Sequence, residues 1–179
     1  LLNADSRSAD VMELVLYNSA ISGISLAGNC FFYRNPLQSN GGRRHSWIGL
    51  ACCPTDLTRF IPQAGGFMYA TGEKKLYVNL YAQGDAVVAL QKGVKVTLSQ
   101  ETEYPWKGKV QLTVTPEKPV AFSMRLRIPG WAAGRPVPST LYRFARNDIP
   151  PVRLHVNGTE VSAVPAADGY VHLNRRWEG

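Results

Sequence analysis

Two periodicities of apolar and polar positions divide this sequence of 179 residues. Within residues 6–20 the apolar side chains recur at helical spacing, and Asp10 and Glu13 stand three residues apart in the manner of a capping box. After Phe67 apolar and polar residues alternate instead, most clearly over residues 76–81, as in strands with one buried face. We therefore expect a mainly helical part to about residue 70 and a mainly β part after it.

Strand candidates follow one another at short intervals in the second part. They cover residues 76–81, 86–90, 94–99, 110–115, 121–128, 152–156, 159–161 and 170–174, and Asn157-Gly158 is the strongest hairpin signal between them. This rhythm indicates an antiparallel β-sandwich. We predict a mainly β fold, with the β-sandwich domain over residues 71–179 and an irregular insertion at about 132–151, preceded by a short helical segment within residues 1–70.

Shorter signals organise the first part. The aromatic run at 31–33 favours a strand, and the polar, glycine-rich residues 38–46 favour a surface loop. Pro54 suits the first position of a helix, which Pro62 should end or kink early and Gly65-Gly66 should stop.

Charge and composition exclude some classes of function. The net charge of +7 comes from scattered Lys and Arg residues without a basic stripe or a nucleic-acid-binding motif, so we expect no nucleic-acid partner. No apolar run approaches the ~20 residues of a membrane span, so we expect no membrane partner.

The chain begins without Met, and Leu1-Leu2 resembles the last residues of a helix that starts earlier. We therefore expect a fragment whose compartment stays open, with a secreted or periplasmic location favoured over a cytoplasmic one.

The adjacent pair Cys52-Cys53 is the most specific chemical feature. Together with Cys30 it makes an odd count, and neighbouring cysteines rarely bridge each other, so a disulfide framework is excluded. If Pro54 opens a helix, Cys53 caps it and the helix dipole favours the thiolate, the form that binds metal and attacks carbon. Cysteine is also among the residues most often buried. The residues alone favour a buried structural pair, with a metal or nucleophile role as the alternative.

A series of ordered motifs resembles glycoside hydrolase family 127, the β-L-arabinofuranosidase family. The motifs are ADVMELVLYN (9–18), ISGIS (21–25), FFYRNPL (31–37), WIGLACCP (47–54), GGFMY (65–69), LYVNLY (76–81), YPW (104–106) and LRIPGW (126–131). The resemblance covers almost the whole chain. It implies that the helical segment is the tail of an (α/α)6 barrel, which carries the active site in that family and is followed by β-sandwich domains.

The resemblance also implies a zinc-dependent mechanism. In the family three cysteines and a glutamate hold zinc, one of those cysteines is the nucleophile, and a separate glutamate is the acid/base. Cys52 matches the zinc-bound nucleophile, Cys53 matches the neighbouring zinc ligand, and Tyr33 matches the tyrosine that touches the sugar. The other two zinc ligands and the acid/base belong to segments upstream of residue 6 that this chain does not contain.

Three positions depart from the family pattern. Leu50 stands where some relatives have a further cysteine, Thr55-Asp56 replaces the commoner Pro-Asn, and Pro62 interrupts a helix that relatives continue.

Two functions remain open from the sequence. The first is a fragment of a zinc-dependent retaining glycoside hydrolase with an oligosaccharide substrate, inactive alone because two zinc ligands and the acid/base are missing. The second is a non-catalytic β-sandwich module that binds carbohydrate or braces the barrel. A truncated barrel would leave apolar helix faces uncovered, so we expect self-association of the isolated chain.

Overall fold

The computed structural model describes residues 4–33, 38, 40–47, 49, 52–90, 93–146 and 148–178. The chain forms two compact units. The sheet unit comprises residues 1–10 and 67–179, and the helix unit comprises residues 11–66. The predicted helix tail at Leu1-Leu2 and the position of Leu50 lie outside the described residues.

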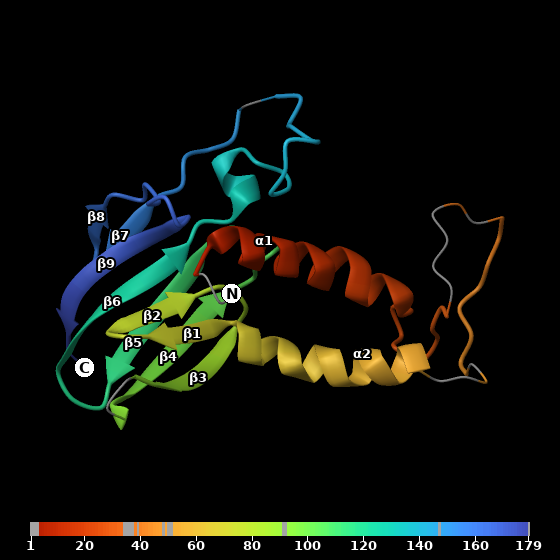
Figure 1. Cartoon of the computed structure of the whole chain (residues 1–179), viewed down its shortest axis with the longest axis horizontal. Coiled ribbons are helices and arrows are strands. Elements are labelled where there is room, and N and C mark those ends of the chain that lie inside the picture. Colours follow the sequence, from red (N-terminus) through yellow and green to blue (C-terminus); the bar gives the residue numbers. More distant parts are fainter. Residues whose placement is uncertain are drawn as a thin grey trace. The chain divides into compact units, whose positions relative to one another are not determined.

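The sheet unit contains a four-stranded sheet in the order β1-β2-β6-β9 (Figure 1). Its strands are β1 (Tyr69–Gly72), β2 (Lys75–Val78), β6 (Val120–Arg127) and β9 (Tyr170–Trp177). The β1–β2 and β6–β9 pairs are antiparallel, but β2 and β6 run parallel, with Leu76 opposite Met124. The expectation of a wholly antiparallel sandwich is therefore wrong at this pair, because β2, on the side away from β1, pairs with a strand more than 40 residues further along the chain rather than with the next strand, β3.

A second sheet in the same unit is antiparallel throughout. It has the order β3 (Gly84–Ala89), β4 (Lys95–Thr102) and β5 (Val110–Pro116). The predicted hairpin at Asn157-Gly158 joins β7 (Leu154–Val156) to β8 (Thr159–Val161), and both turn residues have positive φ, 52° and 82°. Between η5 (Gly130–Ala133) and β7, the described residues form neither helix nor strand.

One apolar core fills the space between the two sheets. In β4 the side chains alternate between exposed and buried, so that Val96 and Leu98 point inward and are fully buried. Leu76 and Val78 of β2 are fully buried in the same cluster, which confirms the alternation read from residues 76–81. The cluster joins both sheets and makes them a sandwich: Leu76, Val78, Leu90, Val96, Leu98, Phe122, Met124, Leu126, Ile128 and Val171.

Buried polar side chains occupy the other face of the four-stranded sheet. Asn79 is 1% exposed, accepts a hydrogen bond from the hydroxyl of Tyr170 at its Oδ1 and another from Arg127 Nε at its carbonyl oxygen. Arg127 also donates to the carboxylate of Asp10, which lies in the first helix. Asn79, Arg127 and Tyr170 are therefore each paired with a group from a distant part of the chain.

That first helix, α1 (Ser6–Leu14), begins in the sheet unit and continues into the helix unit as a π-helix, η1 (Val15–Ala20), and a 3₁₀ turn, η2 (Ile21–Gly23). The side chain of Asp5 caps it by accepting the N–H of Arg7 at 2.9 Å. The predicted helix over residues 6–20 is confirmed, but the capping box at Asp10 and Glu13 is wrong, because the helix begins four residues before Asp10.

The helix unit also contains α2 (Cys52–Gln63), which leads into the 3₁₀ helix η3 (Ala64–Phe67). The helix begins at Cys52, so Pro54 is its third residue rather than its first, and Cys53 is not a cap. Pro62 lies inside α2, one residue before its end. The aromatic run at 31–33 forms isolated bridges of Phe31 with Ile24 and His45 rather than a strand.

Candidate active site

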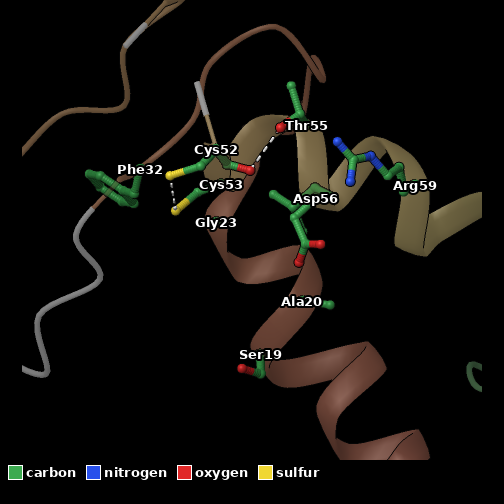
Figure 2. Close-up of a pocket in the computed structure, with 10 residues that line it drawn as sticks. Ser19, Ala20, Gly23, Phe32, Cys52, Cys53, Thr55, Asp56 and Arg59 are labelled. Carbon is green, nitrogen blue, oxygen red and sulfur yellow. Dashed lines mark hydrogen bonds between the residues drawn. The ribbon is translucent and has the colours of Figure 1, made fainter. Parts of the chain in front are cut away.

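The two adjacent cysteines open onto a pocket in the helix unit (Figure 2). Its volume is ≈ 560 Å³, within the range typical of small-molecule sites. The wall comes from η1, η2, the segment after it and the first two turns of α2: Ser19, Ala20, Gly23, Phe32, Cys52, Cys53, Thr55, Asp56, Leu57 and Arg59.

Threonine hydroxyls bond to the backbone in the first turns of α2. Thr55 donates its hydroxyl to the carbonyl oxygen of Cys52 at 2.9 Å, and Thr58 does the same to Thr55 at 2.8 Å. Pro54 is tolerated in the first turn because its missing N–H has no intrahelical partner there. Both thiols therefore lie in the first turn of α2, at the positive end of its dipole.

The cysteines are free thiols at the surface of the pocket. The sulfur atoms of Cys52 and Cys53 lie 3.9 Å apart, too far for a disulfide. Cys52 is exposed and Cys53 half-buried, so the interpretation as a buried structural pair is wrong. The pKa of the Cys53 thiol is raised by burial, and further by its hydrogen bond to Cys52 and by the nearby charges of Cys52 and Asp56.

The spacing of the sulfurs fits a shared metal ion. Two thiolates bound at about 2.3 Å to one tetrahedral zinc lie about 3.8 Å apart, and the observed separation is 3.9 Å. Cys52 and Cys53 could therefore occupy one edge of such a tetrahedron. Within the described ranges, no group of three or more His, Cys, Asp and Glu side chains is close enough together to hold a metal. The pair fits half of a zinc ligand set.

The aromatic run contributes Phe32 to the pocket. Its ring is drawn beside the two sulfurs in Figure 2. Tyr33, which the family resemblance matches to a sugar-contacting tyrosine, is 47% exposed and is not among the residues that line this pocket. Tyr33 nevertheless follows Phe32 directly in the chain.

Two charged side chains contribute to the pocket. Asp56 and Arg59 also line the pocket from α2, with Asp56 drawn nearer to the cysteines than Arg59 (Figure 2). Sequence reasoning did not assign a role to Arg59 or Phe32. Helical periodicity could have indicated Arg59, because positions 52, 56 and 59 lie on one face of a helix. Phe32 depends on folding of the segment that precedes α2 and has no comparable signal.

Comparisons with known proteins agree over both units. The family model "Beta-L-arabinofuranosidase, GH127 catalytic domain" matches residues 1–66, and "Beta-L-arabinofuranosidase, GH127 middle domain" matches residues 75–179. The second match alone covers more than half of the chain. This chain belongs to the GH127 β-L-arabinofuranosidase family. The family resemblance read from the ordered sequence motifs is thereby confirmed.

Individual GH127 proteins show the same relationship. A non-reducing end β-L-arabinofuranosidase of Bifidobacterium longum subsp. longum is 34% identical in an alignment of length 143, which covers 70% of this chain and 21% of that protein. A solved GH127 β-arabinofuranosidase is 44% identical with a TM-score of 0.89, covering 97% of this chain and 27% of that one. The GH127 β-L-arabinofuranosidase from Geobacillus stearothermophilus T6 is 35% identical with a TM-score of 0.80 over the same shares.

The chain thus spans 21% to 27% of the length of these relatives. None of the helices in the described part of the chain has the length and apolarity that a membrane crossing needs.

Proposed function

We propose that this chain carries the nucleophile of a retaining glycoside hydrolase that releases β-L-arabinofuranose from an oligosaccharide. The observation that carries the proposal is the pair of free thiols, 3.9 Å apart, in the first turn of α2 and open to a pocket of ≈ 560 Å³. The pair lies in the segment matched by the GH127 catalytic domain, and relatives named β-L-arabinofuranosidases supply the substrate class. On this proposal the helix unit is the last part of an (α/α)6 barrel.

Cys52 is the proposed nucleophile because it is the exposed member of the pair. Its thiolate sulfur attacks the anomeric carbon, a C–S bond forms, and the C–O bond to the leaving group breaks with its electron pair going to that oxygen. A general acid protonates the departing oxygen. Water then attacks the same carbon, the C–S bond breaks, and its electron pair returns to Cys52 while the acid/base takes the proton of the water. Two displacements at one carbon give net retention.

Cys52 and Cys53 are the proposed zinc ligands of this chain, and their sulfur spacing supports that assignment. When bound, zinc would keep both sulfurs ionised at neutral pH. In this chain the pKa of the Cys53 thiol is raised. Its sulfur lies 3.9 Å from that of Cys52, where it could bind the same ion. The remaining ligands and the acid/base glutamate are proposed to lie outside these 179 residues, so the chain alone should not hydrolyse substrate.

The test compares this chain with a version extended upstream to the length of its relatives. Hydrolysis of p-nitrophenyl β-L-arabinofuranoside and stoichiometric zinc are expected only in the extended protein, and Cys52→Ser should abolish hydrolysis. Mass spectrometry should find a pentosyl group on the peptide that carries Cys52 after rapid quenching. Full hydrolysis by Cys52→Ser would disprove the proposal.

A non-catalytic carbohydrate-binding function of the sheet unit is the second candidate. The observation that favours it is the exposure of Trp106 (89%) and Trp131 (39%), with the Trp131 ring 6.1 Å from that of Tyr104. Aromatic rings at a surface can stack on sugars. Binding of oligosaccharide that is equal in both versions of the chain and unaffected by Cys52→Ser, but lost in Trp131→Ala, would favour this function over the first.

A further inference from the structure

We propose that Phe32 is the wall on which the sugar ring packs in the Cys52 pocket, and that Arg44 is the positioning residue that holds the Phe32 ring in place. This inference rests on the proposed function. It adds a contact residue and its support, neither of which follows from the cysteine chemistry.

Main-chain hydrogen bonds fix the backbone on which Phe32 stands. The N–H of Phe32 donates to the carbonyl oxygen of Gly23 at 3.0 Å, and the residue before it, Phe31, exchanges two hydrogen bonds with His45 at 2.8 and 2.9 Å. The N–H of Ser25 donates to Cys30 at 2.8 Å. Phe32 is therefore anchored against the end of η2 on one side and near Arg44 on the other, and its side chain is directed into the pocket.

Arg44 fixes the orientation of the ring. Its guanidinium carbon lies 4.6 Å from the centroid of the Phe32 ring, within the range of a cation–π contact. Its Nη2 donates to the carbonyl oxygen of Ser22 at 2.7 Å. Because the guanidinium is tied to the backbone of η2 and lies over the ring, it restricts rotation of Phe32 and covers one face. Phe32 also lines the pocket, so part of its surface remains open to a ligand.

The chemistry of this wall suits a sugar. A furanose presents C–H bonds on the faces of its ring and hydroxyl groups around its edge, so a flat apolar surface complements its face while polar groups elsewhere bind the hydroxyls. Phe32 is the aromatic side chain among those that line the pocket, and its ring lies at the sulfur end (Figure 2). A sugar packed on it would present its anomeric carbon near Cys52.

The experiment uses a protein of the relatives' length that contains this sequence. Phe32→Leu keeps an apolar side chain but removes the flat ring, and Arg44→Gln keeps a donor for Ser22 but removes the cation. Arg43→Gln is the matched control, because Arg43 is the neighbouring exposed arginine. The probes are p-nitrophenyl β-L-arabinofuranoside and L-arabinose as a competitive inhibitor. Zinc content and the rate of Cys52 alkylation by iodoacetamide report on the thiol pair separately.

Phe32→Leu should raise the inhibition constant of L-arabinose and KM about five- to tenfold, the range of one aromatic contact. Arg44→Gln should raise both about threefold. Zinc content and alkylation should stay unchanged, since both variants leave the two cysteines and the first turn of α2 unaltered. Arg43→Gln should match the unaltered protein, and Phe32→Tyr should restore binding because it keeps the ring.

Unchanged inhibition and KM in both variants would overturn the inference. A loss of zinc or a change in alkylation in step with the loss of binding would also overturn it, because the residues would then support only the local fold. Neither result contradicts the proposed function as long as Cys52→Ser remains inactive. Conversely, an active Cys52→Ser disproves the proposed function whatever Phe32 does.

Discussion

The guanidinium of Arg127 is fully buried and donates a hydrogen bond of 2.7 Å to the carboxylate of Asp10, a residue 117 positions earlier in the chain. The same carboxylate accepts the N–H of Gly130 at 3.1 Å. Asp10 thus compensates a charge that has no access to water. Such pairs contribute little net stability over apolar replacements, but removing one partner leaves the other charge buried and unpaired.

We therefore predict that Asp10→Ala lowers the free energy of unfolding of the sheet unit by about 3–5 kcal/mol. Urea-induced unfolding followed by circular dichroism measures this change. The matched control is Lys107→Ala, which removes the exposed pair with Glu103 and should cost at most about 1 kcal/mol. The double variant Asp10→Ala with Arg127→Met should be less destabilised than the sum of the single ones. Equal losses for Asp10→Ala and Lys107→Ala would contradict the prediction.

This relationship also marks the limit of prediction from sequence. Alternation over residues 76–81 correctly predicted that Leu76 and Val78 point into the core and Asn79 away from it. It gave no sign that Asn79 is also buried, because its partners, Arg127 and Tyr170, lie 48 and 91 positions away. The parallel pairing of β2 with β6 was missed for the same reason. Local signals predict elements, whereas the choice of distant partners depends on packing.

At the candidate site, too, the sequence predicted the local features but not the contacts between distant residues. The sequence predicted that the thiols of Cys52 and Cys53 lie at the start of a helix and are not bridged to each other, since adjacency and a nearby proline are local facts. It did not predict the contact of Arg44 with Phe32, which lie in a segment with few regular elements. Nor did it predict that Cys52 is exposed, because exposure depends on the residues that surround it in space.

Gly169 offers a prediction about close packing against α1. Its φ is 78°, and a Cβ atom there would lie 1.8 Å from Oγ and 2.7 Å from Cβ of Ser6, whose N–H donates to Asp168 at 2.9 Å. Gly169→Ala should cost about 2–4 kcal/mol, from strain of the left-handed backbone plus displacement of Ser6. Gly158→Ala is the control: its φ is 82° with nothing within 4 Å, so it should cost only about 1 kcal/mol in thermal unfolding. Ser6→Gly should recover part of the Gly169→Ala loss, and equal costs at both glycines would disprove the overlap.

Tyr170 should make the sheet unit sensitive to high pH. Burial raises the pKa of its phenol from 10.0 to about 12, although the nearby charge of Arg127 opposes this. Below pH 10 the phenol is neutral in both states and the effect is absent. Between pH 10 and about 12 the unfolded chain releases the proton while the folded chain keeps it, so stability falls with rising pH, by about 2–3 kcal/mol in total.

Urea unfolding at a series of pH values from 8 to 11 tests the effect of Tyr170. Tyr170→Phe should be less stable at neutral pH by about 1–2 kcal/mol, because Oδ1 of Asn79 loses the hydroxyl that donates to it at 2.8 Å. Its further loss at high pH should be smaller than that of the unaltered chain. Tyr142→Phe, at a tyrosine that is 68% exposed, should leave the high-pH loss in place. Parallel pH profiles for Tyr170→Phe and the unaltered chain would contradict the assignment.

Pro62 should weaken the last turn of α2. It lies inside the helix, one residue before Gln63, where its ring crowds the carbonyl group of Thr58 and no N–H is available to bond it. Pro62→Ala permits that hydrogen bond, at the cost of a less restricted unfolded chain, so we expect a net gain of about 1–2 kcal/mol. Hydrogen exchange of the peptide that covers α2 should slow in this variant.

Pro54→Ala is the control for Pro62→Ala. Pro54 is buried in the first turn, where a proline is tolerated, so its replacement should give no gain in stability. Faster exchange in Pro62→Ala would mean that the fixed φ of the proline stabilises this turn more than the missing hydrogen bond weakens it.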